Sequence, residues 1–391
     1  MMGRRAAVAA VALLAGACAG DLTSPFAAVA VTYDAGKHQY KLAQVPVTTM
    51  TGSLRHLQGS AGTVRAGGTV RVVEAALAQK GATVDVLRAQ FITAQPQEVN
   101  LSWSVLNDIV YPEDFASLEL LSGYYNLEKA RSKFQSEFGL ATLPAMPIVA
   151  HATVLDDRGL SPLGPGELYY PPLATFYFPV PTSADVQLPL VFNPGAVAHA
   201  LGHEAVAQLV WGGAPVAAPE TGPAKDPQWN RARHVARSMT EGLADYLGVA
   251  TTGDPRWFDH SEQQRAAQSA LDVIRCSTPD MLQALPVDDD LAPYNPFPLG
   301  TVLAAALWEA SQGSVPQVIA KGVLAALPDI AARVSSDASQ LNLALVLDAL
   351  VKAAAPEQQN ELCGLFLNRF SKLSVTSLPS CSAPVPHQEC Q

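Results

Sequence analysis

The chain has 391 residues, 49% of them hydrophobic, and a formal net charge of −10. This length and apolar content predict a globular protein with a large core and more than one structural unit. Net negative charge without a long basic run argues against binding to nucleic acid or to an anionic lipid surface.

The first 18 residues have the pattern of an export signal. Arg4 and Arg5 precede an apolar stretch at 6–14 that is too short for a permanent membrane span. The following LAGAC resembles a bacterial lipobox, with Cys18 as the lipidated first residue of the mature chain. This resemblance implies a lipoprotein of the bacterial cell envelope. Cleavage at one of the alanines that flank Cys18 would instead give a soluble secreted protein.

Residues 19–105 are predicted to form a small β-rich unit. VTYDAGKHQYKL and GTVRAGGTVRVVEAAL alternate apolar and polar residues and are interrupted by glycines, as in β-hairpins. We find no chemical motif in this unit.

Residues 106–255 are predicted to form a second unit. The spacing of apolar residues at 112–139 predicts a helix. Strands are expected at Met146–Leu155, Ala174–Val180 and Val186–Phe192. These strands would form a sheet that leads into the next helix.

That next helix carries two histidines at helical spacing. Asn193 and Pro194 give the N-cap and first-position signature of a helix start. His199 and His203 are four residues apart and therefore lie on one helix face, from which two imidazoles can bind one metal ion. A third ligand would have to come from elsewhere.

A second helix supplies carboxylates at the same spacing. Asp226–Pro227 repeats the cap signature, and the helical pattern continues to a stop at Thr251–Gly253. Glu241 and Asp245 lie four residues apart on this helix. They provide the other half of a possible metal site.

Residues 256–374 are predicted to form a mainly helical lobe, followed by a tail at 375–391. Its expected helices are Ser261–Ala284, Gly300–Gln312, Val315–Leu327, Gln340–Ala354 and Pro356–Leu373. Four cysteines besides Cys18 suit two disulfides in an oxidising compartment, namely Cys276, Cys363, Cys381 and Cys390. Three pairings are open, and Cys381 with Cys390 is the most economical because it would fasten the tail.

Three motifs within roughly 140–312 resemble those of the gluzincin metallopeptidases, and most closely their fungalysin-like branch. These are HALGH at 199–203, EGLADY at 241–246 and FPLGTVLAAALWE at 297–309. The resemblance implies an α+β fold, with zinc bound by His199, His203 and Glu241. It also implies that Asp245 orients a ligand histidine.

Two departures from the family pattern affect catalysis. Ala200 stands where the family has the general-base Glu, and Phe297 stands where it has a His thought to stabilise the oxyanion. The expected function is therefore zinc binding without peptidase activity, with a peptide or protein ligand in the old substrate cleft.

Two alternatives stay open. Glu204, one turn after Ala200, would be a displaced base in an active zinc endopeptidase, with His260 or Tyr294 as the missing transition-state donor. Otherwise Glu204 is a solvated or salt-bridged helix residue. In the second alternative the motifs are a structural relic that holds no metal.

Overall fold

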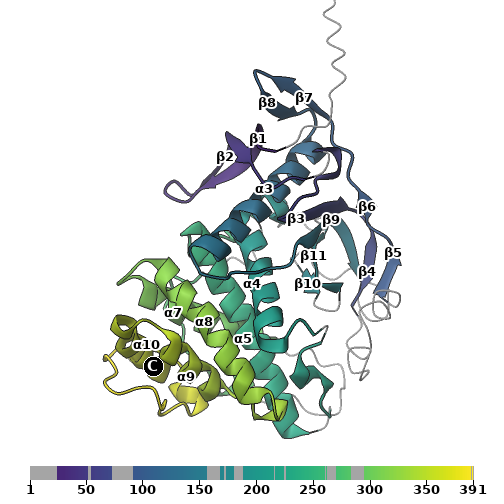
Figure 1. Cartoon of the computed structure of the whole chain (residues 1–391). Helices are drawn as coiled ribbons and strands as arrows, with labels where there is room; N and C mark the ends of the chain where they lie inside the picture. The colour runs from purple at the N-terminus through teal and green to yellow at the C-terminus, as the bar shows by residue number, and fades with distance from the viewer. Residues whose placement is uncertain are drawn as a thin grey trace, which may run out of the picture.

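The structure is a computed structural model of the chain (Figure 1). The residues it describes are 24–51, 54–72, 91–155, 168–170, 173–179, 188–214, 216–223, 226–259, 261, 270–282, 295–388 and 390. The segment predicted to be an export signal, with Cys18, lies outside the described residues. Strands occupy the first half of the chain and long helices the second, which confirms the α+β prediction. Among the described residues, no helix has the length and apolar character needed to cross a membrane.

One sheet has four strands in the order β2-β1-β8-β7. β1 and β2 form the antiparallel hairpin that the alternating pattern predicts, and β8 lies parallel to β1 on its other side. The strands are β1 (Phe26–Asp34), β2 (Gln39–Val47), β7 (Trp103–Leu106) and β8 (Ile109–Pro112).

The larger sheet has seven strands and is built around β9, which pairs in parallel with β3, β4 and β11. Its strands are β3 (Gly62–Ala66), β4 (Thr69–Arg71), β5 (Ile92–Ala94), β6 (Gln97–Glu98), β9 (Met146–Leu155), β10 (Leu168–Tyr170) and β11 (Thr175–Pro179). The strands expected at 146–155 and 174–180 are confirmed. The sheet takes strands from both sides of residue 105, where the sequence suggests a boundary between units.

Helix α3 (Phe115–Ser136) lies between the two sheets and contacts strands of both (Figure 1). It is the helix expected at 112–139, and Asp114 caps its N-terminus by accepting a hydrogen bond from the Ser117 N–H. Glu128 of α3 is buried and accepts hydrogen bonds from the backbone N–H groups of Thr48 and Thr49, just after β2. This carboxylate ties the first hairpin to the helix.

The strand expected at Val186–Phe192 is wrong over the residues the structure describes. Leu190–Phe192 form a short 3₁₀ helix, η3, and all three side chains are buried. The apolar run reflects this burial rather than strand pairing. Pro189 precedes it and has no N–H with which to join a strand ladder.

Two long helices follow and run side by side through the centre of the molecule, α4 (Pro194–Trp211) and α5 (Pro227–Thr252) (Figure 1). The C-terminal lobe packs against them. Its helices are α7 (Phe297–Ser311), α8 (Pro316–Val334), α9 (Leu343–Ala353) and α10 (Pro356–Arg369). Four of the five expected C-terminal helices are thus confirmed, and α8 continues through Pro328 beyond its expected end.

The expected helix at Ser261–Ala284 is wrong where the structure describes it. Residues 270–278 form turns and irregular chain, and only Pro279–Leu282 make a 3₁₀ helix, η5. A disulfide joins Cys276 to Cys390, and the Ser277 N–H donates to the Arg369 carbonyl. These two bonds to distant parts of the chain hold the segment in a non-helical conformation. Pro279 also disfavours helical geometry at the residue before it.

The disulfides correct the favoured cysteine pairing. Cys276 bonds to Cys390, and Cys363 of α10 bonds to Cys381. The tail is therefore fastened at two points to the helical lobe instead of being closed on itself. Pairing across 114 residues is decided by the fold, so proximity in sequence was a poor guide.

Candidate metal centre

The N-terminus of α4 begins where the cap signature predicts. The Asn193 side chain accepts hydrogen bonds from the N–H groups of Gly195 and Ala196, and Pro194 occupies the first turn. The Asn193 amide also donates to the Trp257 carbonyl and to the Ser261 hydroxyl. One residue therefore both starts the helix and ties it to the chain that follows α5.

Helix α5 also begins and ends as expected. Asp226 accepts hydrogen bonds from the N–H groups of Gln228 and Trp229, and Gly253 ends the helix with a left-handed backbone at φ 75°. Glycine adopts this conformation without strain, which explains the stop after Thr252.

A close crossing brings the chemical faces of α4 and α5 together. A methyl group at Gly202 would lie 2.7 Å from the Ala244 Cα atom, so only glycine allows this approach. Gly202 precedes His203, and Ala244 precedes Asp245. The crossing therefore sets the distance between the histidines of α4 and the carboxylates of α5.

His199, His203 and Glu241 converge at this crossing into a group that could hold a metal ion. The two Nε2 atoms are 2.8 Å apart, and each lies 3.6 Å from Glu241 Oε2. His199 is 2% exposed, whereas His203 is 11% and Glu241 18% exposed. The group is thus buried on the His199 side and reaches solvent on the other.

Asp245 lies on the opposite side of His199. Its Oδ1 atom is 2.9 Å from His199 Nδ1, and both side chains are almost fully buried. A carboxylate at this position favours the tautomer that carries hydrogen on Nδ1. His199 Nε2 then presents its lone pair to the space shared with His203 and Glu241.

Aromatic rings surround the histidines. The His199 ring lies 5.9 Å from the ring of Trp257 and 6.5 Å from that of Phe258. The Tyr169 ring lies nearly parallel to that of His203, at 18° and a centroid distance of 5.9 Å. Sequence reasoning missed all three aromatic residues, because they are distant in the chain and belong to no motif.

Ala200, which stands where the gluzincin resemblance expects a general base, is fully buried. Ala200 has no exposed surface and belongs to the main hydrophobic core. Its methyl group can neither accept nor donate a proton.

Glu204 is also fully buried, which contradicts the expectation of a solvated or salt-bridged residue. One of its carboxylate oxygens accepts a hydrogen bond from the Tyr169 hydroxyl, and the other accepts one from the Gln208 amide at 2.8 Å. Burial raises the pKa of the Glu204 carboxyl group. Both oxygens are thus engaged in bonds within the protein.

Phe297 begins α7 and lines a pocket of about 500 Å³ together with Ile274, Met281 and Thr301. None of the metal-group residues lines this pocket. α7 nevertheless packs closely on α5. The two helices leave no room for a methyl group at Gly242, which would overlap the Gly300 carbonyl oxygen. His260 and Tyr294, the other proposed donors, lie outside the described residues.

The last residue of the third motif has a structural partner that the sequence did not indicate. Glu309 of α7 accepts two hydrogen bonds, at 2.7 and 3.0 Å, from the guanidinium group of Arg369 on α10. Arg369 is 1% exposed. The pair therefore joins α7 to the helix that the Cys363 disulfide fastens to the tail.

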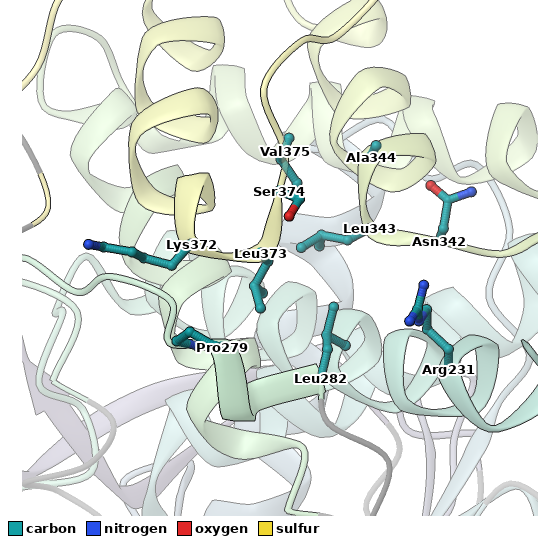
Figure 2. Close-up of a pocket in the computed structure, with 10 residues that line it drawn as sticks. All are labelled: Arg231, Pro279, Leu282, Asn342, Leu343, Ala344, Lys372, Leu373, Ser374 and Val375. Carbon is teal, nitrogen blue, oxygen red and sulfur yellow. The ribbon is translucent and has the colours of Figure 1, made fainter. Parts of the chain in front are cut away.

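A second pocket of about 610 Å³ lies in the C-terminal lobe, between the start of α9 and the segments around η5 and 371–373 (Figure 2). Arg231 of α5 extends into it, whereas Lys372 points outward. No residue of the metal group lines it. The pocket is a feature separate from the metal centre.

The buried histidine of α5 is distinct from the metal group. His234, seven residues before Glu241, is buried, and burial with the nearby Arg237 and Arg233 lowers its pKa to about 4. This imidazole is therefore neutral at pH 7.

Comparison with known proteins gave no match, either to a protein-family model or to a curated protein.

Proposed function

We propose that this chain is an exported zinc-binding protein with a gluzincin-like fold that has lost peptidase activity. In this proposal, His199, His203 and Glu241 bind the ion, and Asp245 orients His199. The single observation that supports it most is the convergence of these three ligand groups from two helices at one crossing.

Zinc fits the ligand set in both geometry and chemistry. A tetrahedral zinc ion with bonds of about 2.0–2.1 Å holds its ligand atoms about 3.3 Å from one another. The three distances of 2.8, 3.6 and 3.6 Å lie around this value. Two imidazoles and one carboxylate also suit zinc better than magnesium or calcium, which prefer oxygen ligands. A zinc ion with one open position acts as a Lewis acid.

Peptidase chemistry lacks its proton carrier. A general base typically contributes about 10²–10⁴-fold to rate, and an oxyanion donor contributes about 10²–10³-fold. Ala200 and Phe297 supply neither group. The alternative base, Glu204, is engaged by Tyr169 and Gln208, which argues against an active peptidase.

Without peptidase activity, the role we propose for the site is to bind a peptide or protein ligand. The partial exposure of His203 and Glu241 supports access by a peptide or protein ligand from the solvent side. The net charge of −10 disfavours nucleic acid as that ligand.

An exported location agrees with the cysteines. Two disulfides form readily in an oxidising compartment and rarely in the cytosol. Together with the lipobox-like sequence at Cys18, they support a lipoprotein of the bacterial cell envelope, or otherwise a secreted protein.

Metal analysis and a protease assay on the mature protein test the proposal. We expect one zinc ion per chain and no cleavage of unfolded casein above that of the chelator-treated protein. Zinc-dependent cleavage that Glu204→Ala abolishes would support an active peptidase instead. A folded chain without zinc would support the alternative in which the motifs are a structural relic that holds no metal.

A second experiment asks whether the two substitutions silence the site. Ala200→Glu combined with Phe297→His introduces the two residue types that the gluzincin resemblance places at these positions. Zinc-dependent casein cleavage by the double variant would show that these two substitutions are what silences the site. Continued inactivity with zinc bound would show that these two positions are not what prevents catalysis.

A further inference from the structure

Tyr169 connects the edge of the larger sheet to α4, the helix that carries His199 and His203. It lies on β10, at one end of the strand order, where its backbone pairs with Phe176 of β11. Its ring packs against the Phe176 ring at 5.2 Å and is 8% exposed. The tyrosine side chain is thus held by the sheet before it reaches α4.

On α4 the same side chain contacts two consecutive residues. The ring lies beside the His203 imidazole at a centroid distance of 5.9 Å and an angle of 18°, within the range of offset stacking. The hydroxyl donates a hydrogen bond to the buried Glu204 carboxylate. Gln208, one turn further along, donates to the other carboxylate oxygen at 2.8 Å.

These contacts restrain the ligand that Asp245 does not touch. Asp245 lies beside Nδ1 of His199, on the buried side of the metal group. His203 is the more exposed of the two histidines, and a ring on a flexible side chain needs a neighbour to hold its rotamer. The Tyr169 ring provides a flat surface parallel to the imidazole, and its hydroxyl bonds to the side chain of the next residue on α4.

We propose that Tyr169 is a positioning residue that sets the zinc affinity of the centre by holding the His203 imidazole in its ligand orientation. The inference rests on the proposed function, because it concerns the same metal ion. Removing neighbours that orient metal ligands typically weakens metal binding by about 10–100-fold. We expect a loss of this size when the Tyr169 ring is removed.

The adjacent residue on β10 offers a matched control. Tyr170 is 3% exposed and packs in a smaller buried apolar cluster that includes Val149 and Val154 of β9, where its ring meets Phe91 edge to face at 5.5 Å. Tyr170→Leu therefore removes a buried tyrosine of the same strand whose ring packs in a different apolar cluster from that of Tyr169. Any loss of zinc binding caused by general weakening of the sheet should appear in this variant as well.

The test is competition titration of zinc with a chelator for the wild type and for Tyr169→Leu, Tyr169→Phe and Tyr170→Leu. We expect Tyr169→Leu to bind zinc about 10–100-fold more weakly than the wild type. Tyr169→Phe keeps the ring and should stay within about threefold, although loss of the bond to Glu204 lowers its melting temperature. Tyr170→Leu should match the wild type in affinity.

The visible absorption spectrum of the cobalt(II)-substituted protein gives an independent readout of ligand geometry. We expect it to change in Tyr169→Leu and to be unchanged in Tyr169→Phe and Tyr170→Leu. If Tyr169→Leu does not fold, Tyr169→Met takes its place, because methionine fills irregular space flexibly.

Two results would overturn the inference. The first is a Tyr169→Leu protein with the zinc affinity and cobalt spectrum of the wild type. The second is a loss of zinc affinity in Tyr170→Leu equal to that in Tyr169→Leu. Failure of the wild type itself to bind zinc would instead reject the proposed function.

Discussion

At the scale of single residues, each histidine of the candidate metal group has a different kind of neighbour. His199 is buried between Asp245 and the rings of Trp257 and Phe258, whereas His203 lies beside Tyr169 nearer to solvent. His199 is therefore the more enclosed of the two histidines. Its orientation depends on one carboxylate.

Replacing that carboxylate tests this dependence. Asp245→Asn keeps the shape of the side chain but removes the charge that favours hydrogen on Nδ1, so we expect zinc affinity to fall by about 10–100-fold. Asp348→Asn is the control, because Asp348 is also buried, and it accepts hydrogen bonds from Arg333 and the Ser380 N–H in the C-terminal lobe, away from the metal group. Equal zinc affinity in the two variants, measured by chelator competition, would contradict the role of Asp245.

His234 gives a prediction for pH. Its pKa is about 4 in the folded protein, below the value of about 6.5 for an exposed histidine. The unfolded chain therefore binds the extra proton first, and stability contributed by the neutral ring is lost as pH falls from about 6.5 to about 4, with a slope of at most about 1.4 kcal/mol per pH unit.

Urea unfolding of metal-free protein at several pH values measures this loss. His234→Gln has no titrating ring, so its free energy of unfolding should fall less steeply than that of the wild type over the same pH interval. Parallel curves for the two proteins would show that His234 titrates normally.

Spacing of four on two capped helices placed His199 with His203, and Glu241 with Asp245, on one face each. The meeting of the two pairs was an expectation from the gluzincin resemblance, and the structure brings them together. Tyr169, Trp257 and Phe258 were not predictable. They reach the site from a strand and a turn, and their positions depend on sheet order and on bonds such as that from Asn193 to the Trp257 carbonyl.

At the scale of elements, local signals located helices better than strands. Asn193–Pro194 and Asp226–Pro227 mark helix starts by chemistry that acts within one turn. The strand expected at 186–192 failed because Leu190–Phe192 are buried in a 3₁₀ helix instead of pairing in a sheet. The helix expected at 261–284 failed, over the residues the structure describes, because the Cys276 disulfide holds irregular chain there. Such constraints come from distant parts of the sequence.

The crossing of α4 and α5 is the contact on which the metal group depends. Gly202→Ala would place a methyl group 2.7 Å from the Ala244 Cα atom and force the helices apart. We expect a loss of about 1–3 kcal/mol in stability, the usual cost of overpacking, together with weaker zinc binding.

Gly313→Ala is the matched control, because nothing lies within 4 Å of the added methyl group. Thermal unfolding and zinc titration of both variants check the expectation. If Gly202→Ala has the same stability and the same zinc affinity as Gly313→Ala, the helices do not need this close approach.

At the scale of the whole molecule, the tail and the disulfides bind the C-terminal lobe together. Cys276–Cys390 closes a loop of 114 residues, whereas Cys363–Cys381 closes one of 18. Cross-links over longer loops restrict the unfolded chain more, by about 4–5 kcal/mol for the first and about 3 kcal/mol for the second.

We therefore expect Cys276→Ser/Cys390→Ser to lower the melting temperature more than Cys363→Ser/Cys381→Ser. Zinc affinity should change little in either, since neither bond touches the metal group. Differential scanning calorimetry gives the comparison, and the reverse order of melting temperatures would contradict it.

The metal ion itself is the most direct test of this account. Crystals of the mature protein, grown without added chelator, can be measured with X-rays just above and below the zinc absorption edge. We predict one anomalous peak per chain, about 2.0–2.1 Å from the Nε2 atoms of His199 and His203 and within bonding distance of the Glu241 carboxylate. An ordered His199–His203–Glu241 group without such a peak, in crystals soaked with zinc, would contradict the claim that the chain is a zinc-binding protein.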